Sequence, residues 1–145
     1  MENSYIIIFD IKKYYTPFKK YGEFDTKREY RILVPLNKEA EEQMYRYQIY
    51  DGSAISPDFK CLEFFEETFY IMDDFFFVPL NQKFDLIITS EEEDVIYTEQ
   101  LDEAKALVMK IIDNIDDPAA IDFGNILLKM IMEAEKYNTV VGFYF

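Results

Sequence analysis

Carboxylates are the side chains in this sequence best able to do chemistry, because the other common catalytic groups are scarce. The 145 residues include 29 Asp and Glu, no His and a single Cys, Cys61. Without His the chain lacks the usual general base at neutral pH and the commonest transition-metal ligand. One Cys cannot form an internal disulfide or a thiolate zinc site. Paired carboxylates, in contrast, can hydrolyse glycosides or hold Mg²⁺ or Ca²⁺.

Four groups of neighbouring acids could supply such pairs, but none has the spacing of a calcium loop or of a known catalytic motif. Solvation or helix capping explains each group more simply. The groups are Glu63/Glu66/Glu67, Asp73/Asp74, residues 91–94 and Asp113/Asp116/Asp117.

The other nucleophiles and ligand-binding loops are equally poorly represented. The glycines and serines are too scattered for a phosphate-binding loop or a nucleophile motif. Cys61 has no base near it in the sequence, so we expect it to be a small buried hydrophobic residue. We therefore predict no catalytic residue, no metal ligand and no cofactor. A carboxylate-based metal-binding or hydrolytic domain remains the alternative.

The negative charge is concentrated in the second part of the chain. Residues 1–62 hold ten Lys/Arg and ten Asp/Glu, whereas residues 63–145 hold five Lys and nineteen Asp/Glu and carry the whole net charge of −14. An anionic surface repels nucleic-acid phosphates and anionic lipids, so we predict no direct binding to either. A basic protein is the partner that such a surface attracts, and charge complementarity can raise association rates to ~10⁸–10⁹ M⁻¹s⁻¹.

Tyrosines beside the acids strengthen this interpretation, because binding hot spots are often Tyr surrounded by polar contacts. Tyr70 lies among the acids of residues 63–74, and Tyr97 lies beside Glu99. The predicted partner-binding residues are Glu63, Glu66, Glu67, Tyr70, Asp74, Glu91, Glu92, Glu93, Asp94, Tyr97, Glu99, Asp102 and Glu103.

The elements that position these residues follow from hydrophobic periodicity. Alternating or continuous apolar runs predict strands at 5–13, 29–36, 75–80, 85–89, 95–98 and 139–145. Spacings of three and four predict helices at 58–72, 99–115 and 118–136, the first with an acidic stripe. Residues 37–50 fit a helix and a strand equally well, with Asn37 as a possible helix cap.

The pattern as a whole predicts a single α+β domain over residues 1–145. We expect a mixed or mainly antiparallel sheet of about five strands with two to four helices packed on one face. The sequence shows no secretion signal, and no apolar run approaches the ~20 residues that span a bilayer, so we predict a cytoplasmic protein.

The functional hypothesis is a small binding protein that inhibits a basic toxin or nuclease by covering its substrate site. Immunity proteins, antitoxin-like proteins and nucleic-acid mimics are the classes that fit. A homo-oligomeric adaptor is a further alternative, with residues 75–77 and 142–145 as its candidate apolar surfaces.

Overall fold

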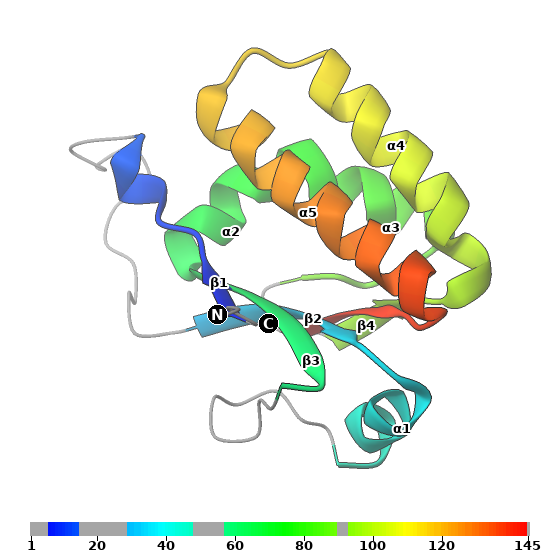
Figure 1. Ribbon diagram of the computed structural model, residues 1–145. Coiled ribbons are helices and arrows are strands. Elements are labelled where there is room, and N and C mark those ends of the chain that lie inside the picture. The colour runs from blue at the N-terminus through cyan, green and yellow to red at the C-terminus, as the bar shows by residue number, and fades with distance from the viewer. Residues whose placement is uncertain (1–5, 15–28, 48–56, 90–92, 145) are drawn as a thin grey trace.

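The computed structural model describes residues 6–14, 29–47, 57–89 and 93–144. A five-stranded mixed sheet with strand order β1-β3-β2-β5-β4 forms its centre (Figure 1). The parallel pair is β1 and β3, and the other neighbouring strands are antiparallel. The strands are β1 (Ile6–Ile8), β2 (Glu29–Pro35), β3 (Phe59–Phe65), β4 (Glu93–Ile96) and β5 (Val141–Tyr144). The predicted α+β fold with about five strands is confirmed.

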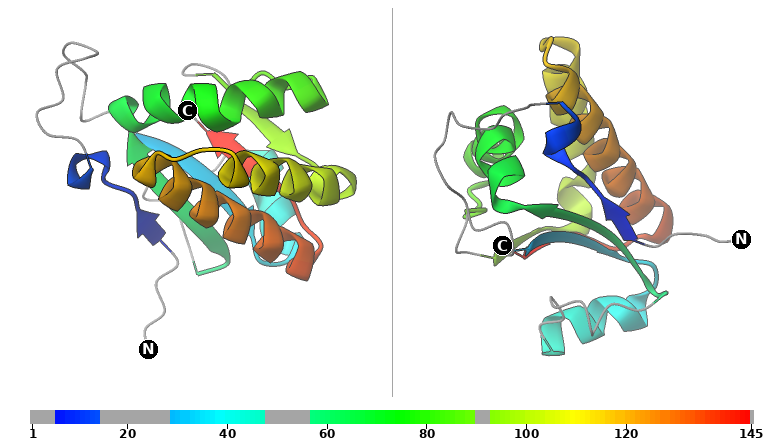
Figure 2. Two further views of the ribbon diagram at one scale, coloured as in Figure 1. Left: turned by 90° about the horizontal axis from the view of Figure 1, so that it is seen from above. Right: turned by 90° about the vertical axis from the view of Figure 1, so that its left-hand side faces the viewer.

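Helices cover both faces of this sheet. The helices are α1 (Lys38–Tyr47), α2 (Glu66–Met72), α3 (Val78–Phe84), α4 (Leu101–Asp113) and α5 (Pro118–Tyr137). Four of them, α2 to α5, lie on one face, which agrees with the prediction, and α1 lies on the opposite face (Figure 2). Both faces of the central strands are therefore buried, which explains why β2 and β3 have long apolar runs.

Each face has its own hydrophobic core. On the side of α2 to α5, Ile32 and Leu62 belong to the larger core. On the side of α1, Leu33 and Cys61 pack with Met44 of the helix. Neighbouring residues of one strand thus point to opposite cores, as the alternation of a strand requires.

Phe123 of α5 lies at the centre of the larger core and fixes the position of β1. Its ring contacts Phe9, which directly follows β1, at a centroid distance of 5.3 Å in an edge-to-face arrangement. Phe64 of β3 contacts the same ring at 5.3 Å, and Phe77 contacts it at 6.1 Å. Such aromatic pairs add about 0.5–1.5 kcal/mol each to the stabilisation from the area that they bury. They hold the β1 edge of the sheet against α5.

The predicted helix at 58–72 is wrong in its first half. Residues Phe59–Phe65 form strand β3, and the helix begins only at Glu66. Leu62, Phe65, Phe69 and Met72 are spaced like a helix face, but β3 is buried alternately on two sides. That alternation was hidden within an almost continuous apolar run. The predicted acidic stripe therefore does not exist as one helix face.

The predicted strands at 75–80 and 85–89 are also wrong. A π-helical turn, Asp73–Phe77, joins α2 to α3, so residues 66–84 form one continuous helix. Pro79 directly follows this π-helical turn, and a departure from regular α-helical hydrogen bonding is common where a proline lacks its N–H. The helix ends at Asp85, which has a φ of 57°. After it, the side chain of Asn81 bonds the backbone N–H and C=O of Ile88, both at 2.8 Å, and so replaces strand pairing there.

Helix-end signals were more reliable. Residues 37–50, left undecided by the sequence, contain α1, and Asn37 caps it by accepting a hydrogen bond from the N–H of Ala40 at 2.7 Å. Asp117 caps α5 by accepting from Ala119 at 2.9 Å and Ala120 at 3.1 Å, with Pro118 in the first turn. The helices predicted at 99–115 and 118–136 are thus confirmed with small changes at their ends.

Strands at the two edges differ more from the prediction. β1 is shorter than predicted and is followed by a 3-10 turn, Ile11–Lys13. β4 begins two residues earlier than predicted and pairs with β5. β5 lies between β2 and β4, which confirms a buried C-terminal strand.

The candidate apolar surfaces for a homo-oligomer are not exposed. Phe76 and Phe77 have no exposed surface, and the residues of β5 are buried. Phe145 lies outside the described residues. Among the helices that the structure describes, none has both the length and the apolarity needed to cross a membrane.

Candidate functional site

Six of the predicted partner-binding acids form two separate groups, at opposite ends of the helix 66–84. The first group, which we call the α2 acids, consists of Glu63, Glu66 and Glu67. The second, which we call the α4 acids, consists of Glu99, Asp102 and Glu103 at the start of α4. Glu103 contacts Lys83, near the end of α3. A helical rise of about 1.5 Å per residue places Lys83 roughly 24 Å from Glu67. The two groups do not form one acidic face.

The α2 acids are bound to side chains of the same molecule. Glu63 faces Arg31 across the β2–β3 pair and accepts a hydrogen bond from its Nε at 3.1 Å. Arg31 also pairs with Glu29, and its side chain is 10% exposed. Such partly buried ion pairs are structural, because loss of one partner leaves the other charge desolvated.

The two helical members of this group are also engaged. Glu66 accepts a hydrogen bond from the Tyr30 hydroxyl at 3.4 Å. Glu67 is 6% exposed, and its carboxylate lies 4.0 Å from the ammonium of Lys12. The orientation of both carboxylates toward β2 and the segment after β1 leaves little charge for a partner.

Further along the same helix, Tyr70 and Asp74 are exposed. Tyr70 packs edge-to-face on Phe69 at 5.4 Å. Burial, with the neighbouring Asp74 charge, raises the pKa of Asp73 above its usual value. These residues lie between the two acidic groups and join neither.

The α4 acids are much more exposed. The side chain of Asp102 is 91% exposed and lies 3.9 Å from Lys105, and Glu103 lies 3.6 Å from Lys83. Exposed pairs of this kind contribute about 0.2–1 kcal/mol, so their acids remain available to a partner. All three α4 acids also lie where the helix dipole favours negative charge.

Asp94, which precedes this group, has a structural role. One of its carboxylate oxygens accepts a hydrogen bond from the N–H of Ile87, and the other accepts from Val95, both at 2.8 Å. Glu91, Glu92 and the side chain of Glu93 lie outside the described part of the chain, although the backbone of Glu93 begins β4.

Tyr45 belongs to the candidate site although the sequence did not indicate it, and its place there follows from the position of Tyr97. Val95 packs in the core on the α1 side of the sheet. Tyr97, two residues later, therefore also points toward α1. Tyr45 of α1 lies on this side of the sheet, close enough to Tyr97 to interact with it electrostatically. Burial raises the pKa of Tyr45, and the charge of Glu41 and the neighbouring Tyr97 raise it further.

We call this junction the Tyr45–Tyr97 surface and include in it the α4 acids that follow Tyr97. The two tyrosines are 44% and 46% exposed, although they come from elements that are distant in the sequence. Half-exposed tyrosines combine apolar contact area with a polar tip, which suits an interface. The sequence contains one signal for the exposure of Tyr45, which is the helical spacing of Ala40 and Met44. On a helix with that buried stripe, Tyr45 falls beside the stripe and not within it.

Cys61 is the thiol that the sequence offers as a nucleophile. Cys61 is fully buried, and burial, with the Glu63 charge, raises the pKa of its thiol to about 12. The nucleophilic thiolate is therefore not formed at neutral pH. The described residues contain no group of three or more His, Cys, Asp or Glu placed to hold a metal ion.

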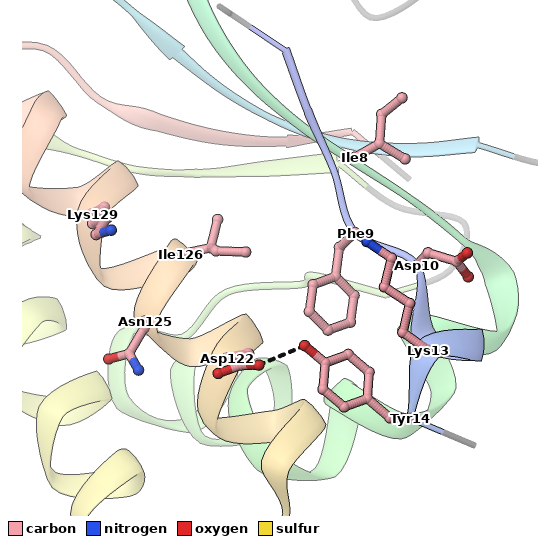
Figure 3. A pocket seen from close by; sticks show the side chains of 9 residues that line it. All are labelled: Ile8, Phe9, Asp10, Lys13, Tyr14, Asp122, Asn125, Ile126 and Lys129. Atoms are coloured by element: carbon pink, nitrogen blue, oxygen red, sulfur yellow. Dashed lines mark hydrogen bonds between the residues drawn. The ribbon is translucent and has the colours of Figure 1, made fainter.

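A separate cavity lies at the opposite edge of the sheet, between the segment Ile8–Tyr14 and α5 (Figure 3). Its volume is about 340 Å³. The rings of Phe9 and Tyr14 stack at 5.7 Å, and the Tyr14 hydroxyl donates a hydrogen bond to Asp122 at 2.5 Å. None of the predicted site residues lines this cavity.

Comparison with protein-family models, with curated proteins and with solved structures found no match for this chain.

Proposed function

We propose that the protein binds a basic protein partner through the Tyr45–Tyr97 surface and inhibits that partner by covering its substrate site. The observation that carries the proposal is that two half-exposed tyrosines from distant elements lie close enough to interact electrostatically, and that exposed carboxylates follow the second of them along the chain. The partner class is a toxin or nuclease whose own substrate is a polyanion, as for immunity proteins, antitoxins and nucleic-acid mimics. No turnover is required of the inhibitor.

The physical chemistry assigns different tasks to the two residue types. The tyrosine rings supply contact area at a small entropic cost, and such residues carry most of the energy of many interfaces. The α4 acids supply long-range attraction that accelerates encounter and weakens as salt is added. Affinity should therefore depend mainly on the tyrosines, and the association rate mainly on the acids.

The proposal restricts the interface to one part of the acidic sequence. The α2 acids are engaged by Arg31, Tyr30 and Lys12, so a partner would have to break internal contacts to use them. The α4 acids have only exposed pairs to exchange. We therefore exclude Glu63, Glu66 and Glu67 from the proposed interface.

Affinity capture from the native cell extract tests this proposal if it uses matched variants. The tagged wild type is compared with the double variant Tyr45→Ala/Tyr97→Ala and with Tyr70→Ala, a similarly exposed tyrosine that lies three residues after Glu67 in the helix 66–84. We expect a basic protein that the wild type and Tyr70→Ala capture and that moderate salt releases. The double variant should bind it at least ~30-fold more weakly, as loss of a hot spot implies.

The purified partner then allows a functional measurement. Its enzymatic or toxic activity should fall to background at one equivalent of wild type and should persist with the double variant. A partner that binds the double variant normally, or that stays active while bound, would contradict the proposal. Loss of binding in Tyr70→Ala alone would move the interface to the α2 side.

A further inference from the structure

The cavity between the segment Ile8–Tyr14 and α5 combines an apolar floor with polar side chains around it. Ile126 of α5 points toward the ring of Phe9, and the Phe9 ring is held from behind by Phe123 (Figure 3). The cavity volume is about 340 Å³. This is near the lower end of the range for small-molecule sites, which is roughly 300–1,000 Å³. The cavity therefore suits a small ligand with an apolar portion.

One face of α5 supplies the polar wall. Asp122, Asn125 and Lys129 line the cavity. They follow one another at intervals of three and four residues, so they lie on the same side of the helix. Lys13 approaches from the other side, where its side chain extends back toward Phe9 (Figure 3). The two ammonium groups thus flank the apolar floor from opposite sides.

The acidic side chains of the cavity have hydrogen-bond partners within the described residues, whereas its lysine side chains do not. Asp122 accepts the hydrogen bond of the Tyr14 hydroxyl, and Asp10 accepts from the backbone N–H of Lys12 at 2.9 Å. The ammonium groups of Lys13 and Lys129 have no hydrogen-bond or ion-pair partner within the described residues. In a chain of net charge −14, two such ammonium groups on one cavity are a local exception to the overall charge.

We propose that this cavity binds a small organic dianion, such as a dicarboxylate, with its apolar centre on Phe9 and Ile126 and its two charged ends at Lys13 and Lys129. The site is independent of the proposed partner surface, because it lies at the β1 edge of the sheet and that surface lies at the β4 edge. A negatively charged protein repels anions in general, so anion binding here requires these local cations.

Titration of the full-length protein with suberate tests the site, and octanediol serves as the uncharged probe of the same length. The readout is the NMR signals of the Phe9 and Tyr14 rings and the Ile126 methyl groups. We expect suberate to move them saturably, and octanediol to bind at least about tenfold more weakly, since it lacks both ionic contacts. Equal binding of the two probes, or no saturable shift with suberate, would overturn the proposal.

Variants assign the charged ends. Lys13→Gln and Lys129→Gln should each weaken suberate binding about fivefold, and together about twentyfold, at the upper end for exposed ion pairs. Lys110→Gln, an exposed lysine of α4 outside the cavity, should leave the titration unchanged. An equal loss of suberate affinity in Lys110→Gln would show that net charge alone explains the effect, and the proposed site would then be wrong. If Tyr97→Ala abolished the suberate shifts, suberate would bind elsewhere and the proposal would be wrong. Failure of partner capture would contradict only the proposed partner surface and not this cavity.

Discussion

The two edges of the sheet use charge in opposite ways. At the β4 edge, the α4 acids are exposed and follow the half-exposed Tyr97 along the chain. Toward the β1 edge, on β3 and α2, Glu63 accepts a hydrogen bond from Arg31, and Glu67 is almost fully buried with Lys12 4.0 Å away. The net charge of −14 is a sum over the whole chain and does not describe the charge that either edge presents to a partner. A carboxylate remains available to a partner when it is exposed, even if it forms an exposed ion pair, and is unavailable when it is buried against a partner of the same molecule.

The helix 66–84 makes this separation possible. It begins beside the β1–β3 side of the sheet and ends next to the start of α4 (Figure 1). Its π-helical turn buries Phe76 and Phe77, so its middle is anchored in the core. The two edges are therefore held at a fixed separation by one rigid element and are free to have different functions.

The largest expected effect comes from disturbing the core packing that supports both edges of the sheet. Gly124 of α5 packs so closely that an added Cβ would lie 2.6 Å from Phe76 Cζ and 2.9 Å from Ile112 Cγ1. Overpacking of a core typically costs about 1–3 kcal/mol, so Gly124→Val should lower the free energy of unfolding by about 3 kcal/mol. Urea denaturation measures this change. Met132 is an exposed position of the same helix. Its replacement, Met132→Val, should change stability by no more than about 0.5 kcal/mol.

The next effect compares an engaged acid with an available one. Arg31 is the shared cation of Glu63 and Glu29 in a partly buried place. Arg31→Ala should therefore lower the free energy of unfolding by about 2 kcal/mol. Lys83 is the exposed partner of Glu103, and Lys83→Ala should cost no more than about 0.5 kcal/mol. Chemical denaturation of both variants is decisive: similar losses would show that the two edges do not differ in how their acids are held.

The sequence predicted elements whose signals are local. Asp117 and Pro118 mark the start of α5, because capping and the first helical turn involve neighbouring residues only. β3 was missed because its alternation depends on two cores that form from distant segments. The run around Pro79 belongs to a helix. The sequence predicts a strand there, because apolar length alone does not distinguish a buried helix from a buried strand.

The candidate site shows the same limit. Tyr97 is predicted from its acidic neighbours along the chain, but its electrostatic interaction with Tyr45 depends on how α1 and the segment after β4 lie in space. Glu63 was assigned to a partner because its own partner, Arg31, lies 32 residues away. Local charge density therefore identified which residues are acidic but not which of them are free to bind.

A third prediction concerns the middle of the helix that joins the edges. Burial and the Asp74 charge raise the pKa of Asp73 in the folded state, so folding disfavours its ionised form. Stability then falls as pH rises from the usual Asp pKa of 3.8 through the raised value, because the native state there binds more protons than the unfolded state. Asp73→Asn should be more stable than wild type at about pH 7 and lose this advantage below about pH 4. Asp116→Asn, at an exposed position, is the control in the same urea series.

The smallest effect tests whether the β1 edge is a built site or an incidental gap. The hydrogen bond from Tyr14 to Asp122 joins the turn after β1 to α5 and raises the pKa of Tyr14 from 10.0 to about 12, with burial and the Asp122 charge as further causes. Its stabilising effect is fully present below about pH 10 and is lost as pH rises through about 12. Tyr14→Phe should cost about 0.5–1 kcal/mol at neutral pH. It should also weaken suberate binding, because the Asp122 carboxylate is then released toward the cavity. Unchanged stability and unchanged suberate affinity in Tyr14→Phe would mean that this contact does not shape the cavity, and the contrast between the edges would then rest on the lysines alone.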